Sequence, residues 1–312
     1  MRSPIRQLAQ LRRRLHLSGA AVPHRRLAAA RKPSHVSVGD GGVVAVDDTS
    51  TPGVSYRYSS YYDLGDFRRQ FFDTVTKRKV NVPVGLFAIG NGAALKPQFY
   101  TPIKLNEVDA TRLIIGAANS VYESLDQGDT IEEIGPGIEV NGSAGNPIAY
   151  GGTGNPDMLY VGSGRNVYVR KEAAPAPLVA SESYPGSSYV VGIAIDPANP
   201  QTAFVIDASN VYLTKDAGAT WTKITGNLMT FDPVVLRSIA YATDVNGGSL
   251  FVGTNAGVFV AAAPDFSNWS RLGSGLPNAP VFRMEYNAAD QILAAGTHGR
   301  GAWTLHFKKR PK

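Results

Sequence analysis

A pattern that recurs about every 45 residues constrains the fold of this chain more than any other feature. In each copy, a short apolar run is followed a few residues later by a small residue and an apolar pair. The pairs are Val121-Tyr122, Val167-Tyr168, Val211-Tyr212, Val258-Phe259 and Ala302-Trp303, spaced 46, 44, 47 and 44 residues apart. The runs before them end at Gly116, Gly162, Ile206, Gly253 and Gly296. A period of this length with four short strands per unit predicts a β-propeller.

The unit at residues 190–224 shows the pattern most clearly. Its four expected strands are Val190–Ile195, Ala203–Ile206, Asn210–Leu213 and Trp221–Ile224, with a Pro-rich turn at 196–200. Short β-branched runs separated by Gly, Pro, Asn and Asp are typical of strands and turns. The composition therefore excludes a solenoid of helix pairs.

Six such units fit in the chain. Their first strands are expected to end near Val46, Leu105, Tyr150, Asp196, Asp244 and Asn287. The first unit is divergent: it begins at Val43, continues through VSYRY and FRRQFF, and carries extra residues from about Thr76 to Gly92. The sequence thus predicts six blades, with a seven-bladed propeller of which this chain is a part as the alternative.

The last unit has only three strand patterns, Val281–Tyr286, Ile292–Ala295 and Ala302–Phe307. A missing outer strand leaves an open sheet edge. His35–Val38, which lies just before the first blade, is a candidate for that strand, so we expect the two ends to close one blade together. The expected organisation is a basic segment at 1–34, the propeller at 35–308 and a basic tail at 309–312.

Composition limits the functions that the chain can perform. Residues 1–33 carry nine of the 31 Lys and Arg and no acid, which leaves 22 basic against 25 acidic residues in the remainder. The propeller is therefore slightly acidic, and we expect no nucleic-acid partner. No cysteine is present, so disulfides and thiolate metal sites are excluded, and no cofactor is expected.

Targeting and membrane signals are weak. No apolar run approaches the 18 residues that a membrane span needs. The basic head is either a presequence or a solvated tail, and its apolar stretch, Leu15–Val22, is a poor match to a signal peptide. Secretion or a periplasmic location is compatible with the sequence, but the compartment and the oligomeric state are not predicted.

Two turns carry a shared motif of hydroxyl, acid and glycine. Thr214, Asp216, Gly218 and Trp221 form one copy, and Ser124, Asp126, Gly128 and Ile131 form the other. A worn third copy, residues 265–269, ends at Trp269 without the glycine. The motif resembles the Asp-box, or BNR repeat, of sialidases, sortilin-type receptors and xyloglucanase-type propellers, and the resemblance covers roughly residues 36–307.

The resemblance implies a structural role for these turns. In families with this box, the turn joins the third and fourth strands on the blade periphery, away from the axial pocket. A short carboxylate there accepts hydrogen bonds from turn amides, and the glycine adopts positive φ at little cost. We therefore interpret Asp126 and Asp216 as structural. A Ca²⁺ site is the alternative, but one isolated carboxylate per turn supplies too few oxygens.

Catalytic residues are harder to assign. A sialidase-like site, as the resemblance implies, needs three arginines, a Tyr/Glu pair and an Asp. Arg283 and Glu285 lie on one face of an expected inner strand, where a structural ion pair is the competing interpretation, and Arg237 is a second candidate axial arginine. A xyloglucanase-like site needs two facing carboxylates, for which Asp40 is the best candidate. His298 and Arg300 are candidate binding residues, with loop fixing as the alternative.

The sequence favours a non-catalytic recognition propeller that binds a glycan or a protein. Tyrosines such as Tyr58, Tyr61, Tyr62 and Tyr100 are candidate contact residues. The alternatives are a glycoside hydrolase, either exo-sialidase-like or endo-glucanase-like, acting at the central axial pocket, and a truncated, inactive fragment. A filled axial channel would favour binding, whereas paired carboxylates or clustered arginines there would favour hydrolysis.

Overall fold

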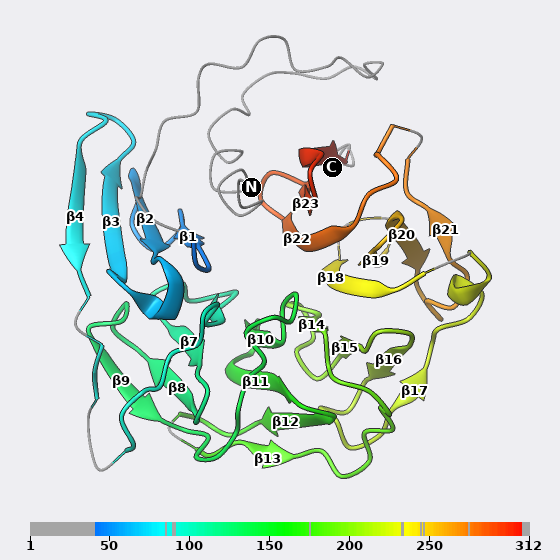
Figure 1. The fold of residues 1–312 in the computed structure, drawn as a ribbon, viewed down its shortest axis with the longest axis horizontal. Helices are drawn as coiled ribbons and strands as arrows, with labels where there is room; N and C mark the ends of the chain where they lie inside the picture. The colour runs from blue at the N-terminus through cyan, green and yellow to red at the C-terminus, as the bar shows by residue number, and fades with distance from the viewer. Residues whose placement is uncertain are drawn as a thin grey trace.

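The computed structural model describes residues 41–307, except residues 85, 89–91, 175, 232–233, 244, 246 and 274. Within this part the regular structure is β, apart from two single turns of 3-10 helix, η1 (Tyr62–Leu64) and η2 (Leu228–Thr230). Six antiparallel blades surround a common centre, and in each blade the chain runs from the innermost strand outward (Figure 1). The predicted six-bladed propeller is therefore confirmed.

The first three blades contain the strands of residues 45–180. Blade 1 consists of β1 (Ala45–Asp47), β2 (Val54–Ser59), β3 (Arg68–Asp73) and β4 (Lys79–Pro83). Blade 2 consists of β6 (Ile103–Leu105), β7 (Leu113–Gly116), β8 (Val121–Ser124) and β9 (Thr130–Glu133). Blade 3 consists of β10 (Ile148–Gly152), β11 (Asn155–Ser163), β12 (Asn166–Arg170) and β13 (Val179–Ala180).

The other three blades contain the strands of residues 192–306. Blade 4 consists of β14 (Gly192–Ile195), β15 (Ala203–Ile206), β16 (Val211–Thr214) and β17 (Thr222–Lys223). Blade 5 consists of β18 (Leu236–Ala242), β19 (Ser249–Thr254), β20 (Gly257–Ala262) and β21 (Ser270–Arg271). Blade 6 consists of β22 (Val281–Asn287), β23 (Ile292–Thr297) and β24 (Gly301–His306).

The repeated apolar pairs all lie on the third strand of a blade. The extra residues expected at 76–92 contain β4, and also β5 (Phe87–Ala88), which pairs in parallel with β9 at the outer edge of blade 2. Blade 6 has three strands in the described part of the chain. The fourth strand expected at His35–Val38 lies outside the described residues, as do Asp40 and Asp244.

Alternation along the strands explains how the blades pack. Successive side chains of a strand point to opposite faces of the sheet, so Ile115 of β7 packs toward blade 1 while Ile114 packs toward blade 3. Five buried apolar clusters are built in this way, and each joins two blades that are consecutive in the chain. Among the described residues, no such cluster joins blade 6 to blade 1.

Two kinds of loop emerge on one side of the propeller: the turns between second and third strands and the connections between blades. In a blade of alternating antiparallel strands, the turns between second and third strands emerge on the same side as the connections that lead to the next inner strand. We call this side the axial face. It carries the starts of the inner strands β18 and β22, the connection 141–147 and the turns at 60–67 and 298–300.

Candidate ligand-binding face

Two β-bulges place an arginine and an aromatic ring side by side at the axial face. The register of β18 shifts between Leu236 and Ser238, and that of β22 shifts between Val281 and Arg283, so Arg237 and Phe282 are the extra residues. A bulge re-aims the side chain that it carries. The Arg237 guanidinium carbon lies 4.9 Å from the centre of the Phe282 ring, which is 38 % exposed. Bulges on neighbouring blades thus create a cation–aromatic pair.

His298 completes this pair from a turn of blade 6. Its ring centre lies 5.6 Å from that of Phe282 in an edge-to-face arrangement, and its backbone N–H donates to the Pro280 carbonyl at 2.8 Å. The side chain of Arg300 is also exposed, and its carbonyl accepts a hydrogen bond from Trp303 Nε1 at 3.0 Å. The structure therefore brings together two of the three predicted binding residues, Arg237 and His298, through a Phe282 that sequence reasoning missed.

The connection 141–147 crosses the axial face and ties several blades together. Asn146 Nδ2 donates to the carbonyl oxygens of Ile193 at 3.2 Å and Ile239 at 3.0 Å, on the inner strands of blades 4 and 5. A side-chain carbon at Gly145 would lie only 2.1 Å from the Arg237 carbonyl oxygen and 3.4 Å from that of Phe282. The backbone at this glycine therefore packs directly on blades 5 and 6. From sequence, the glycine-rich segment 142–156 predicts a surface connection; in the structure, residues 142–147 cross the axial face and Ile148–Gly152 form β10.

A cluster of charges lies along the inner strands β6 and β22, beyond the bulge that carries Phe282. Arg283 and Glu285 share a face of β22, as alternation predicted, and interact electrostatically. Burial lowers the pKa of Arg283. Lys104 of β6 lies within electrostatic reach of both and pairs with Glu107 at 2.6 Å. Burial alone would lower the pKa of Lys104. The negative charges of Glu107 and Glu285 outweigh this effect, so the pKa of Lys104 is raised. Lys104 was not predicted, because its interaction with Arg283 and Glu285 joins inner strands of blades that are far apart in the chain.

The two acid-glycine turns have the same hydrogen-bond pattern. In one, Thr214 Oγ1 donates to Asp216 Oδ1 at 2.8 Å, and Thr220 donates to the same carboxylate through its N–H at 2.8 Å and its hydroxyl at 2.6 Å. Gly218 has φ of +81° and donates its N–H to Thr214 Oγ1 at 2.9 Å. The hydrogen bonds from Thr220 lower the pKa of Asp216.

The second turn repeats each of these contacts at equivalent positions. Ser124 Oγ donates to Asp126 Oδ1 at 2.8 Å, and Thr130 donates its N–H and hydroxyl to Asp126 at 2.8 and 2.6 Å. Gly128 has φ of +93°, a conformation that glycine adopts without strain. Both carboxylates are thus occupied by their own turns, each between the third and fourth strands of a blade.

Each turn also contacts the blade that precedes it. Trp221 Nε1 donates to Ser181 Oγ at 2.9 Å, and the Trp221 ring meets Tyr184 edge-to-face at 5.1 Å. Trp269 is buried and donates Nε1 to the Ile224 carbonyl of blade 4 at 3.2 Å. Ile131, at the tryptophan position of the other motif, is buried in the cluster between blades 1 and 2.

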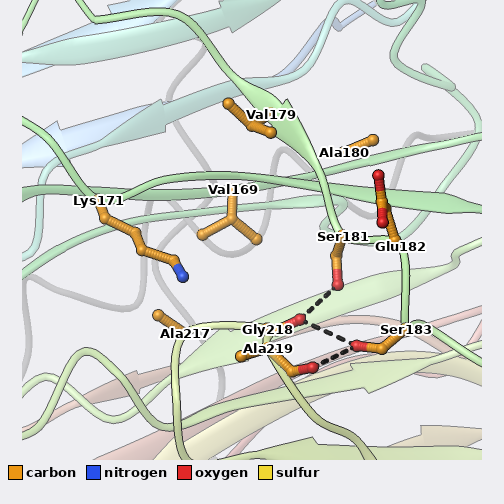
Figure 2. Close-up of a pocket in the computed structure, with 10 residues that line it drawn as sticks. All are labelled: Val169, Lys171, Val179, Ala180, Ser181, Glu182, Ser183, Ala217, Gly218 and Ala219. Carbon is orange, nitrogen blue, oxygen red and sulfur yellow. Dashed lines mark hydrogen bonds between the residues drawn. The ribbon is translucent and has the colours of Figure 1, made fainter.

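A peripheral groove of about 340 Å³ follows one of these seams (Figure 2). Ser181 and Ser183, which follow β13, form its wall, and their hydroxyls donate to the Gly218 carbonyl at 2.6 and 3.2 Å. Val169 and Ala217 also line it. The groove lies at the rim between blades 3 and 4, on strands remote from the axis.

The tyrosines named as contact candidates differ in exposure. Tyr58 is 1 % exposed and belongs to the core between blades 1 and 2, so that prediction is wrong. Tyr58 lies on the face of β2 that packs against blade 2. Alternation along a strand separates its two faces but does not show which of them is buried. Tyr62 is 44 % exposed, and Tyr61 and Tyr100 lie partly buried beside it.

Within the described residues, no group of three His, Asp or Glu is placed to hold a metal, and no helix has the length and apolarity to cross a membrane.

Comparisons with known proteins bear on the fold. No protein-family model matches the chain, and no curated protein matches it. Among solved structures, it is similar to an ancestral GH74 enzyme (TM-score 0.58, 14 % identity, 86 % of this chain and 37 % of that one). It is also similar to the GH74 xyloglucanase from Xanthomonas campestris (TM-score 0.58, 16 % identity, 86 % of this chain and 46 % of that one). The chain thus spans less than half the length of either, and at these identities the likeness shows a shared β-propeller fold.

Proposed function

We propose that this chain is a non-catalytic recognition propeller that binds a glycan on its axial face. The observation that carries the proposal is the Asn146 crossing. Its side chain joins the inner strands of blades 4 and 5, and the adjacent Gly145 packs on the backbone of blades 5 and 6. A chain segment therefore lies over the inner strands of blades 4, 5 and 6 at the axial face, which argues against an open reaction pocket at that place, and Phe282 and His298 of the cluster beside it are exposed.

The chemistry of that cluster suits recognition. Phe282 offers an exposed ring, and Arg237 and His298 offer hydrogen-bond donors. The Nε atom of Arg237 is buried and has no hydrogen-bond partner among the described residues. The neighbouring solved structures include a xyloglucanase, and this supports a glycan over a protein as the ligand. A fold does not fix a function, so the test must be made on the chain itself.

We further propose that the turns at 124–131 and 214–221 are Asp-boxes with a purely structural role. Their support is the identical hydrogen-bond pattern of Asp126 and Asp216 and their place between third and fourth strands. Both carboxylates are engaged within the turn. Ser124, Gly128, Thr214, Gly218 and Trp221 belong to the same two corners.

Glycoside hydrolysis is the second candidate function. The observation that favours it is the pair of carboxylates, Glu107 and Glu285, which both interact with Lys104. Two carboxylates are what such a reaction requires. Asp40, the carboxylate that the sequence singled out, lies outside the described residues and stays a candidate.

Two measurements separate these functions. Binding is assayed on an array of neutral and acidic glycans, comparing the natural chain with Arg237→Gln. Turnover is assayed with fluorogenic sialosides and β-glucans, with Glu285→Gln and Asp40→Asn as controls. We expect glycan binding that Arg237→Gln weakens, and no turnover. Turnover that is lost in either carboxylate variant would replace the recognition proposal with hydrolysis.

A further inference from the structure

The geometry points to a sugar-stacking subsite on the axial face, formed by the exposed rings of Tyr62 and Phe99. This inference rests on the proposed glycan-binding function and adds a place and a contact chemistry to it. We propose that a pyranose ring of the ligand packs against these two rings. Neither residue belongs to the Arg237–Phe282–His298 cluster, so the subsite is a separate contact.

Four aromatic rings form a continuous row here. Tyr61 meets Tyr62 edge-to-face at 5.4 Å, Tyr62 stacks on Phe99 at 5.6 Å with 11° between the planes, and Phe99 meets Tyr100 edge-to-face at 4.9 Å. Parallel rings with centres this far apart are offset, so each leaves part of a face uncovered. Tyr62 and Phe99 are 44 % and 52 % exposed. The two central rings of the row are thus available to a ligand, while the two end rings support them.

The backbone that presents Tyr62 is strained. Asp63, Leu64 and Asp66 have φ of 54°, 52° and 47°, all in the left-handed region although none is glycine. Such conformations persist only where the surroundings impose them, and they cluster at binding sites. The ring of Tyr61 lies so close to Gly65 that a side-chain carbon at that position would be 1.9 Å from it. The turn is therefore built around the aromatic row.

The second half of the row comes from a turn of blade 2 that is fixed independently. Gln98 N–H donates to Thr101 Oγ1 at 2.8 Å, and that hydroxyl donates back to the Gln98 carbonyl at 2.9 Å. Asp63 N–H donates to the Phe99 carbonyl at 3.4 Å, which connects the two turns. The row consequently spans two blades and has backbone support from both.

The row is continuous with the axial crossing. Gly142 N–H donates to Gln98 Oε1 at 3.0 Å, and a side-chain carbon at Gly142 would lie 2.0 Å from the Tyr100 carbonyl oxygen. The same crossing reaches Arg237 and Phe282 through Gly145. The aromatic row and the cation cluster are therefore connected by one short segment, as expected for two contacts of an extended ligand.

The flanking groups favour a sugar over a proline-rich peptide, which is the other ligand that exposed aromatic rings attract. Asp63 places an exposed carboxylate next to Tyr62, and the Asp66 carboxylate, which pairs with Arg68 at 2.8 Å, follows in the same turn. Carboxylates only accept hydrogen bonds. A sugar offers hydroxyl donors to them, whereas a proline-rich backbone offers carbonyl acceptors. The C–H face of a pyranose also suits the electron-rich face of an aromatic ring.

The test compares variants on the glycan array and then by affinity electrophoresis in gels that contain the best-bound soluble glycan. Phe99→Ala and Tyr62→Ala are expected to lower affinity about tenfold or more, since exposed aromatic contacts dominate such interfaces. Phe99→Trp keeps an aromatic ring at this position, so its affinity for the glycan is expected to be close to that of the natural chain. Leu125→Ala is the matched control, because Leu125 is 55 % exposed but lies in a turn on the opposite side of the ring.

The outcomes separate this inference from the function on which it rests. If the natural chain binds a glycan and both alanine variants bind equally well with unchanged melting temperatures, the subsite is wrong and the proposed function stands. If the natural chain binds no glycan on the array, the proposed function fails and the subsite fails with it. Binding of a polyproline peptide that depends on Phe99, without glycan binding, would replace the sugar by a protein ligand.

Discussion

Arg170 and Glu123 form a two-pronged ion pair across the seam between blades 3 and 2. Arg170 Nη1 lies 2.6 Å from Glu123 Oε2, and Nη2 lies 2.8 Å from Oε1. The side chains are 0 % and 3 % exposed. Arg112 donates to the same carboxylate at 3.2 Å and also pairs with Asp157, and the Tyr150 hydroxyl donates to Glu123 as well. Such a network leaves few buried lone pairs unsatisfied.

Removing one partner of this pair is expected to destabilise the fold strongly. Glu123→Ala leaves Arg170 as a buried, uncompensated charge, which typically costs about 3–5 kcal/mol. The double variant Glu123→Leu/Arg170→Met removes both charges and should recover much of that loss. Urea unfolding of the three proteins measures the difference. A single variant as stable as the natural chain would contradict the assignment.

The same network predicts a dependence on pH. Burial raises the pKa of Glu123, but hydrogen bonds from Arg170, Tyr150 and Arg112, with the charge of Arg170, hold it below its usual value. A carboxylate whose pKa is lower in the folded state stabilises the fold above its unfolded pKa of about 4.3, and this contribution is lost as the pH falls through the folded pKa. The stability gap between the natural chain and Glu123→Gln should therefore shrink below about pH 4, as measured by unfolding at pH 3 to 6.

The sequence predicts those features that repeat. The apolar pairs identify the third strands because every blade must bury both faces, and the hydroxyl-acid-glycine spacing identifies the turns because all of the contacts of Asp126 and Asp216 within them are local. The strand bounds are less exact: the expected strand Val190–Ile195 begins at Gly192. Before that point, the Val190 N–H donates to the Gly164 carbonyl in the turn between β11 and β12.

The candidate ligand-binding residues were predicted only in part, for a physical reason. Arg237 and His298 are recognisable as polar residues near inner strands, but Phe282 and Phe99 read as ordinary core residues. The exposure of Phe282 depends on a register shift in β22, and Phe99 lies in a turn before β6 that Gln98 and Thr101 hold. Glu123 and Arg170 lie 47 residues apart in the chain, and no local pattern distinguishes them from surface charges.

The three tryptophans provide a test of the blade corners. Trp221 packs on blade 3 and donates to Ser181, so Trp221→Ala is expected to cost about 3 kcal/mol, the low end for a large core side chain. Ser181→Ala should cost about 1 kcal/mol, because it removes the acceptor of the indole N–H. Thermal and urea unfolding measure both changes.

Trp303 is the internal control for that comparison. It is 37 % exposed on β24, so Trp303→Ala should cost clearly less than Trp221→Ala. Trp221→Ala is expected to retain glycan binding, since Trp221 lies at a blade corner away from the axial face, whereas Trp303 bonds the Arg300 carbonyl of the turn at 298–300. Equal losses for the two would argue against a special structural role for the corner, and loss of binding in Trp221→Ala alone would move the ligand to the rim.

Gly65→Ala is expected to affect binding more than stability. Gly65 has φ of −58° and ψ of 136°, which alanine adopts without strain. The added methyl carbon would nevertheless lie 1.9 Å from a ring carbon of Tyr61, so the ring must move, and Tyr62 and Phe99 must move with it. The double variant Gly65→Ala/Tyr61→Ala separates the causes. If the ring clash is the reason, Gly65→Ala weakens glycan binding in the natural chain but changes nothing further once Tyr61 is alanine. Additive losses in affinity electrophoresis would instead show that the glycine matters by itself, because independent sites add whereas sites in contact do not.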